Sequence, residues 1–132
     1  MAELDYAYLA DYAQIEGGKI SALGASYTHA SVPEVPVGWM TSVVGRVRVD
    51  EDEGPVSVRI EVVPPGGAMR LNAESSLERT ASVRPYRGKV GLLFAATLQL
   101  PIAEPGLCSI DIHINGEHAR HLAFEVEVIE ES

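Results

Sequence analysis

The chain is poor in the residues from which disulfide frameworks, membrane spans and nucleic-acid surfaces are built. Its one cysteine, Cys108, cannot form an internal disulfide, so we expect it to act as a small buried apolar side chain. Ten basic residues stand against 19 acidic ones, and the net charge of −9 disfavours nucleic acid, because phosphate binding needs a basic surface. No apolar run approaches the ~20 residues that span a bilayer, and the first residues carry acid where a secretory signal carries base. We therefore expect a cytoplasmic protein with neither a nucleic-acid nor a membrane partner.

Motifs of nucleophilic and phosphate-handling enzymes are also missing. There is no Gly-x-Ser-x-Gly turn for a serine nucleophile. The glycine pairs Gly17-Gly18 and Gly66-Gly67 lack the lysine and hydroxyl residue of a phosphate-binding loop. Cys108 lies in an apolar alternation rather than in the electropositive, exposed setting of a reactive thiol. We therefore expect no catalytic residues, no cofactor and no enzymatic activity.

What the chain does contain is alternation of apolar and polar residues, with no long helical pattern. Its clearest stretch runs from Pro105 to Val128 and has the period of a strand with one buried face. About eight such segments are separated by glycine and proline turn signals, a pattern typical of sandwiches. The sequence predicts an all-β, single-domain antiparallel β-sandwich over residues 1–132, Ig-like in type, with a closed barrel as the alternative. The further strands are expected at 4–13 (with a helix as competitor), 19–31, 39–49, 56–62, 69–77 near a sheet edge, and 89–100, with a loop at 80–88.

The last two strands make a prediction about their own turn. Asn115-Gly116 favours a two-residue hairpin loop, which would pair Ile112 with Ala119. The apolar residues of the return strand, however, begin at Leu122 and have the other parity. Both apolar sets share a face only if the loop has an odd number of residues or a bulge follows it. We expect that irregularity between Asn115 and His121.

The segments on either side of the acidic loop at 50–55 are expected to pair with each other. If Val49 faces Val56, then Arg46 lies opposite Arg59, and like charges in that position are mildly unfavourable. An acidic side chain should then lie close to the two arginines.

Asp11 interrupts the first strand and shares its parity with apolar neighbours. We expect its carboxylate to point inward, accept backbone N–H groups and fix the turn at 14–18.

Two polar clusters are candidate metal sites. Asp111, His113, His118 and His121 are expected on the outer face of the last hairpin, where strands can bring imidazoles and a carboxylate together. Their spacing matches no strong metal motif, and solvated surface residues explain it equally well. The acidic loop from Asp50 to Glu53 lacks the ligand spacing of a calcium loop, so a solvated hairpin tip is preferred. No metal is predicted.

Some apolar residues do not fit one inner face, and a contiguous exposed apolar patch would mark an interface. The alternative is that loops of the chain cover them. The residues that do not fit are Trp39, Met40, Val44, Val63, Leu93 and Ala95, and the first five are the candidate interface residues.

Two segments match a recognisable pattern. The first contains Leu9-Ala10-Asp11-Tyr12-Ala13, Glu16-Gly17-Gly18-Lys19 and Gly24-Ala25; the second contains Leu100-Pro101, Glu104-Pro105-Gly106, Asn115-Gly116-Glu117 and Phe124-Glu125-Val126. The chain resembles a family of uncharacterised bacterial and phage proteins that is known only as a domain of unknown function. The resemblance implies a small β-sandwich with no assigned activity, so it transfers no functional residues.

The expected function is a non-catalytic interaction or assembly module that acts through a sheet face or edge, with another protein or a second copy as partner. The alternative is a ligand-binding sandwich with a pocket lined by Tyr6, Tyr8, Tyr12, Tyr27 or Trp39. A metal-dependent enzyme that uses the histidine cluster ranks last.

Overall fold

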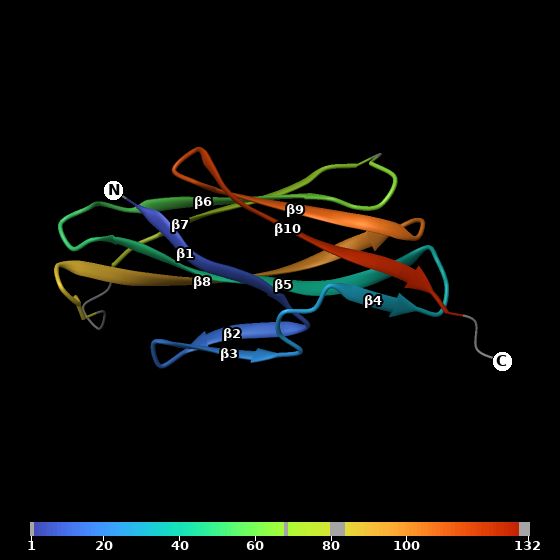
Figure 1. Cartoon of the computed structure of the whole chain (residues 1–132), viewed down its shortest axis with the longest axis horizontal. Coiled ribbons are helices and arrows are strands. Elements are labelled where there is room, and N and C mark those ends of the chain that lie inside the picture. Colours follow the sequence, from blue (N-terminus) through green and yellow to red (C-terminus); the bar gives the residue numbers. More distant parts are fainter. Residues whose placement is uncertain (1, 68, 80–83, 130–132) are drawn as a thin grey trace.

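A computed structural model describes residues 2–67, 69–79 and 84–129, and within these ranges the chain is entirely β (Figure 1). It contains no helix long and apolar enough to cross a membrane in these ranges. The all-β prediction is confirmed. The strands are β1 (Glu3–Ala10), β2 (Tyr12–Glu16), β3 (Lys19–Leu23), β4 (His29–Val32), β5 (Val37–Asp50), β6 (Val56–Val63), β7 (Leu71–Leu77), β8 (Lys89–Ile102), β9 (Gly106–Ile114) and β10 (Glu117–Val128).

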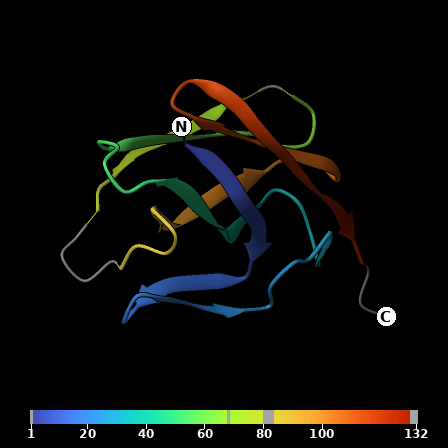
Figure 2. The ribbon, with the colours of Figure 1, turned by 60° about the vertical axis from the view of Figure 1, so that its left-hand side comes forward.

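The strands form two facing sheets and a separate hairpin. One sheet has the order β1-β5-β8, and the other has the order β4-β10-β9-β6-β7. The hairpin β2-β3 lies on the outer side of the three-stranded sheet, away from the larger sheet (Figures 1 and 2). All pairs are antiparallel except β4 and β10, which run parallel. The predicted sandwich is confirmed, with one parallel pair at its edge.

The core lies between the two sheets because alternate residues of each strand point inward. β5 contributes Val43 and Val47, β9 contributes Ile110 and Ile112, and all four are fully buried. The opposite face of β5 is also covered: Val44 packs with residues of the β2-β3 hairpin and is 0% exposed. The hairpin also packs against Ala95, on the outer face of β8.

The β9-β10 hairpin contains the expected irregularity. Ile114 pairs with Glu117, so the loop has two residues, and both Asn115 and Gly116 have positive φ angles of 50° and 84°. These angles fit the type I′ turn that Asn-Gly favours. A register shift between His118 and Arg120 then restores the parity of the return strand. The predicted irregularity is confirmed, and it is a bulge after a two-residue loop rather than a longer loop.

The expected pairing across the acidic loop is wrong. β5 pairs with β1 and β8, whereas β6 pairs with β7 and β9 in the other sheet. Arg46 lies opposite Leu93, and Arg59 lies opposite His113, so the two arginines are not opposed. The error arises because alternation defines which face of a strand is buried and says nothing of which strand lies beside it.

Asp11 also differs from its predicted role. It is exposed, at a bend between β1 and β2, and its N–H donates to the Leu23 carbonyl over 2.9 Å. Its carboxylate lies against Gly24, where an added Cβ would be 2.0 Å from Oδ2. Gly24 has a φ of +61° and ends β3, so the segment expected as one strand at 19–31 is divided there. Of the loop expected at 80–88, residues 80–83 lie outside the described ranges.

Replacement of Gly45 by alanine should destabilise the sandwich. A Cβ at Gly45 would lie 2.5 Å from Phe94 Cζ and 2.6 Å from the Tyr6 carbonyl oxygen, so backbone and ring must shift. We expect Gly45→Ala to lower the free energy of unfolding by about 1–3 kcal/mol in urea denaturation. The control is Gly54→Ala, where a Cβ meets no atom of the described residues within 4 Å. Equal stabilities of the two variants would contradict this packing.

Candidate functional site

The three-stranded sheet ends at β8, and the outer edge of this strand is its most distinctive feature. β8 pairs with β5 without a register shift from Lys89 to Ile102. No strand of the described part of the chain pairs with its other edge. From Val90 to Leu100 the strand has no charged residue and no proline. A long, uncharged, unpaired edge is a template for a further strand.

One hydrogen-bond pair defines which residues of β8 face the open edge. The Lys89 N–H donates to the Tyr86 carbonyl over 3.0 Å, and the Tyr86 N–H donates to the Lys89 carbonyl over 2.6 Å. The backbone groups of Lys89 therefore point away from β5, and because these groups alternate along a strand, so do those of every second residue. The residues whose N–H and C=O face the open edge are Gly91, Leu93, Ala95, Thr97 and Gln99, and none of the five is buried.

Pro101 has the same phase as these five residues. Its missing N–H therefore falls on the open side, where no ladder bond to β5 is lost, which is the position that a sheet tolerates for proline. The ladder with β5 continues past it to Ile102. Pro101 thus ends the series of edge donors without breaking the sheet.

The other three edges of the sandwich carry recognised protection against strand addition. β1 has a register shift between Leu4 and Tyr6, and the Leu9 carbonyl accepts a bond from the Ser26 N–H over 2.6 Å. β4 is only four residues long. β7 is polar and carries Glu74. Among the described edges, β8 alone lacks such a device between Val90 and Leu100.

A groove of about 1180 Å³ adjoins the first part of the β8 edge. It lies between the tip of the β2-β3 hairpin and the segment that leads into β8, with Tyr86 in its lining. Its described lining contains four of the chain's ten basic residues and one of its 19 acids. These residues are Arg46, Arg48, Arg84, Lys89 and Glu78.

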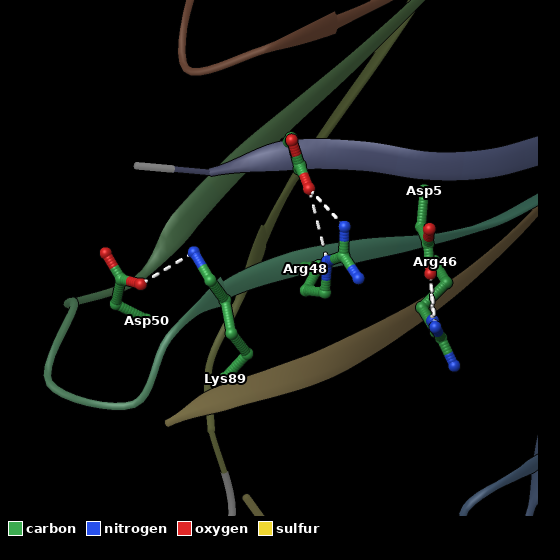
Figure 3. Close-up of polar contacts among 6 residues, drawn as sticks. Asp5, Arg46, Arg48, Asp50 and Lys89 are labelled. Atoms are coloured by element: carbon green, nitrogen blue, oxygen red, sulfur yellow. Dashed lines mark hydrogen bonds and ion pairs between the residues drawn. The ribbon is translucent and has the colours of Figure 1, made fainter. Parts of the chain in front are cut away.

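Three of these cations are held by acids next to the groove (Figure 3). Lys89 Nζ lies 2.8 Å from Asp50 Oδ1, and its hydrogen bond holds the Asp50 carboxyl pKa far below its usual range. Arg46 binds Asp5, with its Nε donating over 2.8 Å. Arg48 donates to Glu3 Oε1 from Nη2 over 2.5 Å and from Nε over 3.2 Å. The arginine and lysine side chains are 41–45% exposed, so solvent screens each pair and its contribution to stability is small. These ion pairs leave the groove close to neutral. Asp50 binds the Lys89 amine, so its carboxylate is not free to bind calcium.

The histidine cluster lies on the outer face of the larger sheet, as predicted. His118 Nε2 and His121 Nδ1 both hydrogen-bond Asp111 Oδ1, over 2.8 and 3.0 Å. The His113 ring packs edge-on against His118 with centroids 5.3 Å apart, and the buried His113 Nδ1 has no hydrogen-bond partner among the described residues. In the described part of the chain no group of three or more such side chains has the arrangement to hold a metal. The cluster is a hydrogen-bonded trio, with His113 packed beside it.

The five predicted interface residues are brought to different places. Val44 is covered by the β2-β3 hairpin, and Trp39 packs on Tyr27, to whose hydroxyl its Nε1 donates over 3.2 Å. Met40 is 47% exposed on β5, and Val63 is half-buried in the other sheet. Leu93 is half-buried at the groove and belongs to the β8 edge. They do not form one patch. Of the five edge residues, the sequence singled out Leu93 and Ala95 as apolar residues that do not fit the inner face.

The aromatic residues expected around a ligand pocket do not line this groove. Tyr27 packs on Phe124 and its hydroxyl hydrogen-bonds Thr41, while Tyr6 and Tyr8 stack on each other with ring centroids 6.2 Å apart. The aromatic residue of the groove is instead Tyr86, which is 74% exposed. Tyr86 forms an isolated antiparallel bridge with Lys89, and the alternation of apolar and polar residues does not predict this contact.

Asp111→Asn should weaken the protein in a pH-dependent way. Partial burial raises the pKa of Asp111, but hydrogen bonds from His118 and His121 outweigh it and hold the pKa below its ordinary value. A depressed folded-state pKa gives stability that is present above the unfolded pKa and is lost as the pH falls through the folded one. We expect the variant to lose about 0.5 kcal/mol at pH 7 in urea denaturation. A difference from wild type that persists unchanged well below the pKa of Asp111 would contradict this origin.

Cys108 should be inert toward thiol reagents in the folded protein. The residue is fully buried, and burial raises its pKa to about 12, so thiolate is scarce at pH 8. We expect no reaction with Ellman's reagent until denaturant unfolds the chain. Rapid labelling of the native protein would show that β9 does not lie in the core as described.

Comparison with known proteins shows what the chain is similar to. No curated protein matches it. Among solved structures it is similar to a chain of Pseudomonas fluorescens alkylpurine DNA glycosylase AlkC bound to DNA with an abasic-site analogue, at 10% identity and a TM-score of 0.50. The match covers 96% of this chain but 30% of that one, so it shows the fold alone. A family of unknown function, DUF6941, matches residues 5–127. The chain belongs to this family.

Proposed function

We propose that this protein is a non-catalytic interaction module that binds an extended protein segment by adding it as a strand to the open edge of β8. The observation that carries the proposal is the unprotected edge from Gly91 to Gln99, where the N–H and C=O groups of every second residue face away from β5. Strand addition gives affinity through main-chain hydrogen bonds and specificity through side-chain pockets. The groove beside Gly91 and Leu93 is such a pocket for side chains at one end of the added segment.

A protein partner fits the charges better than a nucleic acid does. The chain carries a net charge of −9, and three of the four groove cations are already bound to carboxylates. The DNA in the similar structure belongs to that protein. The hypothesis of a metal-dependent enzyme has no support from the described residues, because no group of them is arranged to hold a metal.

Three finer expectations are part of the same proposal. We place the protein in the cytoplasm, in keeping with its single buried cysteine, and we propose a bacterial or phage source. The sandwich is proposed to be Ig-like because a three-stranded sheet faces a larger one. The parallel β4-β10 pair and the additional β2-β3 hairpin are departures from that fold's standard order.

The proposal is tested with peptides selected from a random library against the immobilised wild-type protein. Thr97→Pro removes an edge N–H while leaving the ladder to β5, because residue 97 has the same phase as Pro101. Thr97→Ala is the matched control, since both variants lose the 3.1 Å hydrogen bond to the Ser42 hydroxyl and only proline loses the amide. We expect Thr97→Pro to weaken peptide binding about tenfold or more, and Thr97→Ala to change it little.

Circular dichroism and thermal unfolding establish that both variants are folded before binding is compared. Selected peptides that bind both variants equally would contradict strand addition at this edge. Failure of a diverse library to yield any binder would contradict it as well.

A further inference from the structure

We infer that the β8 edge pairs with the β8 edge of a second copy of this chain, antiparallel and around a two-fold axis that passes beside Ala95. The inference rests on the proposed function, because it names the segment that the open edge binds. The pairing joins two three-stranded sheets into one continuous six-stranded sheet with the order β1-β5-β8-β8-β5-β1.

At each end of the open edge one residue prevents further backbone pairing, and these two residues, the stops, are placed symmetrically. At one end, the backbone groups of Lys89 are already used by Tyr86. At the other end, Pro101 has no N–H to donate. Both residues lie equally far from Ala95 along the strand, so the free window from Gly91 to Gln99 is centred on that residue. A two-fold axis requires such a centre, because the same surface must match itself.

The centre fixes which residues face each other. Ala95 faces Ala95 of the second copy, Leu93 faces Thr97 of the second copy, and Gly91 faces Gln99 of the second copy. All of these residues have their backbone groups on the open side, so every pair exchanges two hydrogen bonds. The resulting ladder contains about ten bonds, the number typical of a whole protein–protein interface.

Alternative registers meet an obstacle. A shift that centres the pairing on Leu93 brings Lys89, whose backbone groups are occupied by Tyr86, opposite Thr97 of the second copy. A shift that centres it on Thr97 brings Pro101 opposite Leu93 of the second copy, where a donor is missing. A shift by one residue places groups already bonded to β5 against the partner edge. The centre at Ala95 alone uses all five open residues.

The side chains across the proposed contact are compatible. The window contains no charge, so no like charges meet when two copies approach. At the outer face Ala95 meets Ala95 of the second copy and Leu93 meets Thr97 of the second copy. The Arg46 side chain of the same chain lies over Gly91. Towards the core side, Leu92 and Leu98 carry apolar side chains at equal distances from the centre. Acidic and basic groups lie beyond the two stops or on the other strands.

The first measurement is the mass of the full chain by size-exclusion chromatography with light scattering over a range of concentrations. We expect a concentration-dependent species of twice the 14.2 kDa monomer. Thr97→Pro should remain a monomer at concentrations where Thr97→Ala is a dimer.

The second measurement tests the register by cysteine cross-linking. Hydrogen-bonded antiparallel partners have Cα atoms about 5.5 Å apart, within the range of a disulfide. Ala95→Cys should therefore form a covalent dimer under mild oxidation. In Thr97→Cys the two cysteines lie about 14 Å apart across the axis and should not be linked. Cys108 is fully buried and contributes no cross-link in the folded protein.

The outcomes separate the two proposals. A wild-type chain that is monomeric at all concentrations, yet binds selected peptides in a Thr97→Pro-sensitive manner, overturns the self-pairing and leaves the proposed function standing. A monomer that binds no peptide overturns both. A dimer in which Thr97→Cys is linked and Ala95→Cys is not overturns the two-fold axis at Ala95, and a dimer unaffected by Thr97→Pro overturns the edge as the contact.

Discussion

The structure depends on the rule that every backbone donor and acceptor of a buried strand needs a partner. Central strands such as β5 and β9 meet this need with a neighbour on each side, and the two sheets then bury their facing side chains as one core. Strands at the edges meet it on one side only. The properties of the four edges therefore decide how this sandwich behaves toward other chains, and β8 differs from the other three.

The arrangement around the edge follows from the same rule. The β2-β3 hairpin covers the apolar outer face of β5 and β8 around Val44 and Ala95, so that face is closed to partners while the edge beside it stays open. The ion pairs of Arg46, Arg48 and Lys89 bind charged groups to carboxylates on β1 and β5. They keep charge beside the groove without placing it in the hydrogen-bonding window of β8.

Much of the fold was predictable from the sequence, because alternation reports which face of a strand is buried. An irregularity after Asn115-Gly116 followed from parity alone, although parity did not decide between a longer loop and the observed bulge. The sequence did not predict which strands lie beside each other. The segments that end at Val49 and begin at Val56 alternate as the two strands of a hairpin would, yet β5 and β6 belong to different sheets. The uncharged run from Val90 to Leu100 is visible in the sequence, but whether it lies at an edge depends on strand order. The histidine cluster was found and its outer position was correct, while the groove with Tyr86 depends on tertiary placement.

The central claim is that β8 has an open edge with a defined phase. Residue-resolved amide hydrogen exchange of the dilute protein, at a concentration where light scattering shows a monomer, tests it most directly. The account predicts fast exchange for Gly91, Leu93, Ala95, Thr97 and Gln99 and slow exchange for Leu92, Phe94, Ala96 and Leu98, which bond to β5. Equal protection of both sets in the monomer would contradict the account, because it would show that the chain already closes this edge itself.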